Sequence, residues 1–202
     1  YTTNKVKGAP LYVTQEHLRD GKARAVICNS GNANTCNVDG VERANEICGL
    51  LAKELSIAPE EIVIASTGVI GPSIDLAPIE AGIPALVAAL SPNGGGDAAE
   101  AIMTTDTKPK EIALSFSAGD RKVTIGGMCK GAGMIAPKMK VPHATMLCYI
   151  TTDCAISNEL LGSMLEEVVD DSFNKVIVDG DMSTNDTVIV MANGASGVEI
   201  RE

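Results

Sequence analysis

Thr145 stands in the stretch "PHATMLCYITTD" (142–153), between a small alanine and an apolar run that ends in two more hydroxyls. A threonine hydroxyl is a weak nucleophile unless a base lies beside it. If the bond between Ala144 and Thr145 is cut, the new α-amine has an unperturbed pKa of about 7.7 to 8.0 and can accept the proton of its own hydroxyl near pH 7. Thr145 is therefore a candidate nucleophile that needs no histidine. A β-branched residue that merely opens a strand is the plainer local interpretation.

Four polar clusters follow β-type runs and combine glycine with serine, threonine or asparagine: "NSGNAN", "STGVIG", "TTDTKPK" and "DGDMSTNDT". Strand ends at the rim of a sheet are where α/β proteins place their sites. The "STG" at 66–68 offers a hydroxyl and a backbone N–H as donors to an oxyanion. Taken singly, most polar glycine-rich turns are only turns.

The familiar catalytic and ligand-binding patterns are absent from the sequence. Neither GxSxG nor HExxH occurs, and "STGVIG" and "KGAG" lack the spacing of a phosphate loop. Six cysteines without a CxxC pair, together with only two histidines, give poor support for a zinc site or a disulfide framework. We expect no metal, and reduced thiols in a cytoplasmic protein.

Composition excludes two classes of partner for this chain of 202 residues. Its 16 basic and 26 acidic side chains give a formal charge of -10, and no basic run could neutralise several phosphates, so we expect no nucleic acid. Apolar runs such as "IPALVAAL" fall short of the roughly 20 residues that cross a bilayer, so we expect no membrane span. With 45% hydrophobic but 2% aromatic residues, the core must be aliphatic, which suits layered α/β packing.

The elements that must position these clusters are predicted from hydrophobic patterning. Strands are expected at 24–30, 61–67, 145–153 and 175–181, with a hairpin over 111–128 and a strand or helix at 184–194; the opening residues are also strand-like. Helices are expected from Val41 behind an Asp39 N-cap, over 76–90 where Gly82 and Pro84 can break or bend the helix, and after a Ser157 cap. Residues 97–106 are expected to form a short helix that runs into a turn. The pattern predicts a mixed sheet layered with helices.

Seven segments in order carry a resemblance to a known family: "TTNKVKGAP", "ARAVICNSGNANTCN", "ASTGVIG", "AIMTTDTKPK", "TIGGMCKGAGMIAPKM", "ATMLCYITTDC" and "DGDMSTNDTVIVMANG". Together they resemble the glutamate N-acetyltransferases, also called ornithine acetyltransferases, of the arginine pathway. The resemblance implies an α/β (α+β layered) fold of mixed β-sheets packed with helices, DmpA/ornithine-acetyltransferase-like and of the N-terminal-nucleophile type.

The resemblance also implies that the chain cuts itself between Ala144 and Thr145. Residues 1–144 would then be an α-chain region lacking its start, and residues 145–202 the truncated start of a β-chain region. The two chains would stay associated, in a higher oligomer. By the same resemblance, Thr145 would take an acetyl group from N-acetylornithine and pass it to glutamate by a ping-pong route.

Further positions match the family's site. Thr67 and Gly68 match its oxyanion hole, and Lys130 and Thr104 match substrate-binding positions. An amino-acid substrate carries a carboxylate, for which a lysine is a suitable charge partner. The resemblance implies no cofactor and leaves open whether acetyl-CoA is a second acetyl donor.

Two departures from the family pattern keep alternatives open. The insertion "KVPH" (140–143) lengthens the segment before Ala144, and part of the family's substrate site falls beyond Glu202, so we expect a fragment or an incomplete record. An amidohydrolase or aminopeptidase would use the same acyl-threonine and lose the acyl group to water. An uncleaved, inactive fragment that binds a small acidic ligand is the non-enzymatic alternative.

Overall fold

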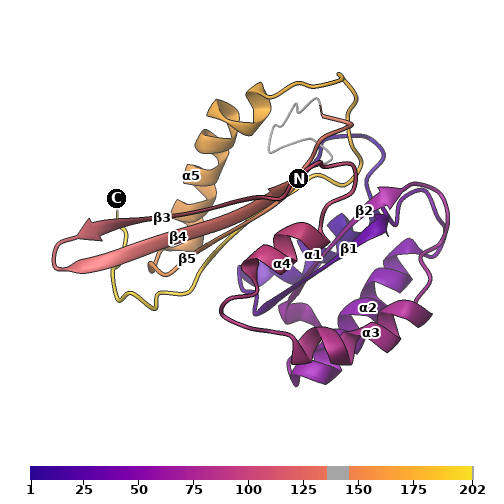
Figure 1. Ribbon diagram of the computed structural model, residues 1–202, viewed down its shortest axis with the longest axis horizontal. Coiled ribbons are helices and arrows are strands. Elements are labelled where there is room, and N and C mark those ends of the chain that lie inside the picture. The colour runs from indigo at the N-terminus through magenta and orange to yellow at the C-terminus, as the bar shows by residue number, and fades with distance from the viewer. Residues whose placement is uncertain (136–145, 202) are drawn as a thin grey trace. The chain divides into compact units, whose positions relative to one another are not determined.

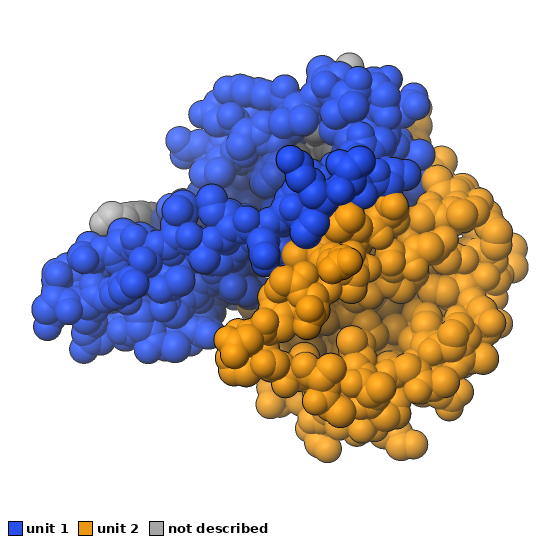
Figure 2. All heavy atoms as spheres, viewed as in Figure 1, with its two compact units in different colours: residues 1–3, 105–202 blue, residues 4–104 orange. Residues whose placement is uncertain are grey.

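The computed structural model describes residues 1–135 and 146–201, which form two compact units. One unit comprises residues 4–104, and the other comprises residues 1–3 and 105–202 (Figure 2). The cleavage point implied by the resemblance falls in the sequence of the second unit, so it does not coincide with the boundary between the units. Each unit is described by itself below.

The unit of residues 4–104 has a short parallel sheet with helices around it (Figure 1). Its elements are α1 (Ala9–His17), β1 (Ala25–Asn32), α2 (Gly40–Leu55), β2 (Ile62–Val69), α3 (Ala77–Ala88) and α4 (Gly95–Ala101). Strands β1 and β2 pair in parallel, in register from Ala25 opposite Ile62 to Gly31 opposite Gly68. Their carboxyl ends therefore meet at one edge of the sheet.

The core of this unit forms because α2 and β2 present complementary apolar faces. In α2 the buried residues Ala44, Ile47, Cys48 and Leu51 recur at the three- and four-residue spacing of one helix face. In β2 the first six residues are all buried, as expected of a strand covered on both faces. The predicted strands at 24–30 and 61–67 and the predicted helix after Asp39 are thus confirmed.

The second unit has a four-stranded mixed sheet in the order β3-β4-β5-β6 (Figure 1). Its strands are β3 (Lys110–Ala118), β4 (Arg121–Lys130), β5 (Leu147–Thr152) and β6 (Thr187–Ala192), and its helix is α5 (Asn158–Asp171). The pairs β3–β4 and β4–β5 are antiparallel, whereas β5 and β6 are parallel. Gly119, with φ of 65°, makes the predicted hairpin turn, and Ser157 Oγ accepts the Leu160 N–H at 3.2 Å as the predicted cap.

Two sequence predictions were wrong. Residues 175–181 form no strand: a 3₁₀ turn covers Phe173–Lys175, and the apolar side chains of residues 176–178 are exposed. The opening residues form no strand, and α1 follows them with Pro10 in its first turn, where a missing N–H is harmless. Helix α3 runs through Gly82 and Pro84, so neither residue breaks it. Residues 184–194, for which strand and helix were both open, contain β6.

No helix within the described residues is long and apolar enough to cross a membrane. All six cysteines are free thiols. Among residues 1–135 and 146–201, no group of three or more histidine, cysteine, aspartate and glutamate side chains could hold a metal ion.

Candidate active site

Thr67 and Gly68 lie at the carboxyl end of β2, directly beside the "NSGNAN" end of β1. In the parallel register Ser30 is opposite Thr67, and Gly31 is opposite Gly68. The Thr67 side chain is buried, with 1% exposure. Gly68 has φ of 129°, and a Cβ on it would stand 2.3 Å from the carbonyl carbon of Gly31. Two clusters that lie far apart in the sequence therefore form one turn structure, in which only glycine fits at position 68.

A polar network between the strand ends supports this turn. Ser66 Oγ donates to Asn29 Oδ1 at 2.6 Å, and the same Asn29 side chain donates to the Asn32 carbonyl at 2.8 Å. Asn32 Oδ1 accepts the Asn34 N–H at 2.7 Å. The Asn29 and Asn32 side chains are half-buried, and these hydrogen bonds offset the cost of removing their amide groups from water.

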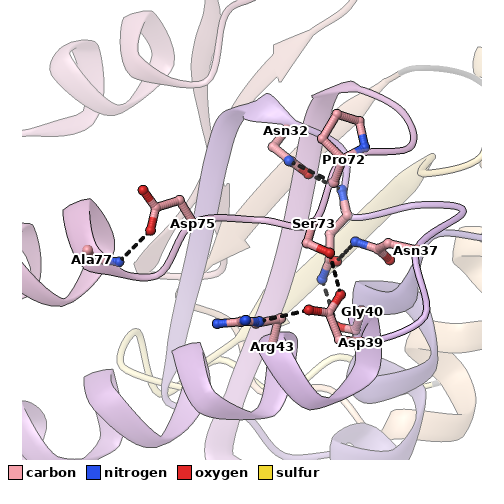
Figure 3. Close-up of polar contacts among 10 residues, drawn as sticks. Asn32, Asn37, Asp39, Gly40, Arg43, Pro72, Ser73, Asp75 and Ala77 are labelled. Carbon is pink, nitrogen blue, oxygen red and sulfur yellow. Dashed lines mark hydrogen bonds and ion pairs between the residues drawn. The ribbon is translucent and has the colours of Figure 1, made fainter.

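The loop that follows Gly68 is tied to the start of α2 (Figure 3). Ser73 Oγ donates to Asp39 Oδ1 at 2.8 Å, and Arg43 Nε donates to Asp39 Oδ2 at 3.0 Å. Asn32 Nδ2 reaches the Pro72 carbonyl at 3.1 Å from the other side. The Ser73 hydroxyl, and then Arg43, hold the pKa of the Asp39 carboxyl below its usual value. Asp39 does occupy the N-cap position, but its side chain accepts from the Ser73 and Arg43 side chains and makes no capping hydrogen bond to a backbone N–H of the helix.

Lys130 ends β4 and is 1% exposed, opposite Leu147 of β5. A buried ammonium requires a compensating negative charge. The carboxyl of Asp186, which is itself 1% exposed, interacts electrostatically with Lys130 and supplies that charge when it is ionised. Asp186 Oδ1 accepts the Met146 N–H at 2.9 Å, so the pair lies at the start of the strand that follows position 145.

The turn after Lys130 is held by two other aspartates. Asp106, the aspartate of "TTDT", is 9% exposed and accepts the Gly131 N–H at 2.8 Å. Asp179 Oδ2 accepts the Met134 N–H at 2.6 Å. The hydroxyl of Thr105 also belongs here, 3.7 Å from where a Cβ on Gly133 would stand. This turn therefore combines a buried cation with fixed carboxylates.

The protonation of Asp186 is unusual because burial raises the pKa of its carboxyl to about 7. The Met146 N–H, the Ser183 hydroxyl and the Lys130 charge oppose that rise. The free carboxyl in an unfolded chain titrates near 3.9. Asp186 is thus a buried acid that changes charge close to neutral pH.

We predict that this acid makes the folded state less stable as the pH rises. Since the folded pKa lies above the unfolded value, the native state binds the proton more tightly, and its contribution to stability is complete below about pH 4 and lost as the pH rises through about 7. Asp186→Asn cannot titrate, so it should lack this loss, which amounts to up to about 4 kcal/mol. Urea unfolding of both proteins from pH 4 to 8 measures it; parallel pH curves would contradict the assignment.

The described structure divides the predicted site residues into two groups. Thr67, Gly68 and the exposed Thr104 belong to the unit of residues 4–104, and Lys130 belongs to the other unit. Ala144 and Thr145, the cleavage site and nucleophile, lie outside the described residues. The roles of all six therefore stay predictions.

Sequence reasoning missed the residues that hold these groups in place, namely Asn29, Asp106, Asp179 and Asp186. Each contacts a backbone or side-chain group distant in sequence, by 37 residues for Asn29 with Ser66 and by 40 for Asp186 with Met146. The only local signal was that all four belong to the polar clusters at strand ends. A closer weighing of the aspartates in "TTDT" and "DGDMSTNDT" would have brought three of them forward.

The fold is a layered α+β one, with a glycine turn at the end of two parallel strands and a buried lysine and aspartate at the edge of a mixed sheet. Comparisons with known proteins agree with this layered α+β fold class. Residues 1–202 match the ArgJ family, and the chain belongs to that family.

Curated relatives are about half identical to this chain. The arginine biosynthesis bifunctional protein ArgJ of Symbiobacterium thermophilum is 52% identical over 198 residues, which are 98% of this chain and 48% of that protein. The glutamate N-acetyltransferase of Methanocaldococcus jannaschii is 50% identical over 204 residues, 100% of this chain and 50% of that protein. The chain thus spans about half the length of these relatives.

Two solved structures confirm the predicted fold class. The ArgJ structure from Bacillus halodurans matches with a TM-score of 0.64 and 39% identity, over 69% of this chain and 74% of that one. The ornithine acetyltransferase of Mycobacterium tuberculosis, solved with ornithine, matches with a TM-score of 0.64 and 40% identity, over 68% of this chain and 74% of that one.

Proposed function

We propose that the protein is an acetyltransferase of arginine biosynthesis that moves an acetyl group from N-acetylornithine to glutamate, in the cytoplasm. The observation that carries this proposal is the match to the ArgJ family from residue 1 to residue 202, which includes the segment around Thr145. The name of the Methanocaldococcus relative and the ornithine in the Mycobacterium structure support the two substrates. We include acetyl-CoA in the proposal as a second donor of the acetyl group.

The proposed chemistry begins with self-cleavage between Ala144 and Thr145, which leaves a free amine on Thr145. The hydroxyl of Thr145 then attacks the acetyl carbonyl of N-acetylornithine while its amine takes the hydroxyl proton. The carbon–nitrogen bond breaks, the proton passes to the leaving amine, and ornithine departs. Glutamate's neutral amine attacks the acetyl-threonine in the second half and restores the hydroxyl.

Two groups of residues support these steps in the proposal. Thr67 and Gly68 donate hydrogen bonds to the oxyanion of each tetrahedral intermediate, and the fixed Gly68 turn makes such donors rigid before the reaction. Lys130 and Thr104 bind substrate, with the Lys130 ammonium as partner of its carboxylate. The cleaved α and β chains stay associated, because β5 follows the cut and pairs with β4 before it, and the assembled protein is a higher oligomer.

Trapping the acyl-enzyme tests this proposal directly. After incubation with N-acetylornithine and without glutamate, mass spectrometry should find one acetyl group on the fragment that begins at Thr145, and adding glutamate should remove it as N-acetylglutamate. Incubation without glutamate also measures loss of the acetyl group to water, which would favour an amidohydrolase. An acetyl group on a cysteine, of which Cys148 is the nearest in sequence, would refute Thr145 as the nucleophile.

A further inference from the structure

The described residues on both sides of positions 136–145 are bonded to one short segment, residues 178–187. On the upstream side, Asp179 Oδ2 accepts the Met134 N–H at 2.6 Å and Asp179 Oδ1 accepts the Ile135 N–H at 2.8 Å. The Val178 N–H donates to the Ile135 carbonyl at 2.7 Å. The Asp179 N–H donates to the same carbonyl at 3.4 Å, so four hydrogen bonds hold the chain just before position 136.

The downstream side is held in a similar way. Asp186 Oδ1 accepts the Met146 N–H at 2.9 Å, and the Thr187 N–H donates to the Met146 carbonyl at 2.9 Å. The Met146 N–H belongs to the peptide bond that joins Met146 to Thr145. Asp186 is 1% exposed, so water does not compete for this hydrogen bond.

The contacts at Asp179 are of the strong, charge-assisted kind. Its two oxygens accept the N–H groups of consecutive residues, and these bonds hold the pKa of the Asp179 carboxyl below its usual value, so it is ionised at neutral pH. Met134 has φ of 59°, a left-handed conformation that costs free energy in a residue other than glycine. The bonds to Asp179 stabilise a backbone turn that the sequence alone would not favour.

We propose that Asp179 and Asp186 are positioning residues for the self-cleavage, holding the two ends of the segment that contains the Ala144–Thr145 bond. This inference rests on the proposed function. In the cleavage, the Thr145 hydroxyl attacks the Ala144 carbonyl, the carbon–nitrogen bond breaks, and the hydroxyl proton leaves on the new amine. Water then hydrolyses the ester, giving a carboxylate at Ala144 and restoring the hydroxyl. An intramolecular attack of this kind depends on alignment, and fixed segment ends restrict the conformations between them.

Cleavage kinetics of single variants in the intact protein test the inference. Protein made by cell-free translation is pulse-labelled, and precursor loss is followed on denaturing gels at pH 7. Asp179→Asn replaces one acceptor oxygen by an NH₂ group that faces an N–H, so the precursor half-life should lengthen about tenfold or more. Asp186→Ala should slow cleavage similarly, whereas Asp186→Asn keeps an acceptor for Met146 and should restore most of the rate. Asp181→Asn, an exposed acid in the same segment, is the matched control and should cleave like the wild type.

The outcomes separate this inference from the proposed function. A folded Asp179→Asn protein, with wild-type circular dichroism and thermal midpoint, that cleaves at the wild-type rate would overturn the inference and leave the acetyltransferase proposal standing. A wild-type precursor that never cleaves would overturn both. Slow cleavage in Asp179→Asn alone, with normal transfer by the fraction that does cleave, supports a role limited to alignment of the cut.

Discussion

Replacing Thr145 by alanine is expected to abolish both the self-cleavage and the acetyl transfer. Alanine removes the hydroxyl that attacks in each reaction, and no neighbouring group in the proposed chemistry substitutes for it. Loss of a covalent nucleophile lowers turnover by about 10³-fold to 10⁶-fold, so the expected rate lies at the detection limit. Denaturing gels should show one intact chain, and coupled assays should show no N-acetylglutamate.

Two further variants distinguish chemistry from packing in this experiment. Thr145→Ser keeps a hydroxyl and should retain part of both activities. Thr151→Ala removes another threonine of the same sequence stretch, an exposed one in β5 whose hydroxyl makes only a long 3.4 Å contact to Gly126, and should leave both activities intact. A Thr145→Ala protein that still transfers acetyl groups would place the nucleophile elsewhere.

Most of the sheet strands could be predicted because their residues carry a strong local signal. The β-branched runs that became β1 and β2, and the alternating hairpin around Gly119, match the patterns typical of strands. The prediction failed at residues 175–181, where a run of three apolar residues looked like a strand. There the Val178 N–H bonds to Ile135 in a turn and joins no sheet, which local patterning cannot show.

Part of the candidate site was predictable because two of its polar clusters directly follow strand-like runs in the sequence. The clusters "NSGNAN" and "STGVIG" were recognised as strand ends, and the parallel register of β1 and β2 brings them together. The aspartates that hold the backbone were not recognised. The residues next to Asp186 in the sequence do not indicate that its partner, Met146, lies 40 residues away. Apolar patterning did not locate the start of α1, because "APLYVTQEH" has no clear apolar face.

Replacing Gly68 by alanine is expected to disrupt the β1–β2 turn. An added Cβ would stand 2.3 Å from the Gly31 carbonyl carbon, 2.5 Å from its oxygen and 2.7 Å from the Asn32 nitrogen. These are backbone atoms of a paired strand, so they cannot move aside without breaking the pairing. The φ of 129° adds strain of its own for an L residue. The two costs together should lower the free energy of unfolding by about 4 kcal/mol or more, and transfer should fail because the proposed oxyanion donors move.

Gly71→Ala is the control that separates the two costs. Gly71 has φ of 112°, but a Cβ there would meet nothing within 4 Å, so this variant pays only the conformational strain of about 1 to 3 kcal/mol. Urea unfolding of the two variants therefore measures the steric term by difference. If Gly68→Ala unfolds at the same urea concentration as Gly71→Ala, the close approach of β1 to β2 at Gly31 is wrong. If Gly68→Ala is strongly destabilised yet its folded fraction transfers acetyl groups at the wild-type rate, the turn is structural and the oxyanion donors lie elsewhere.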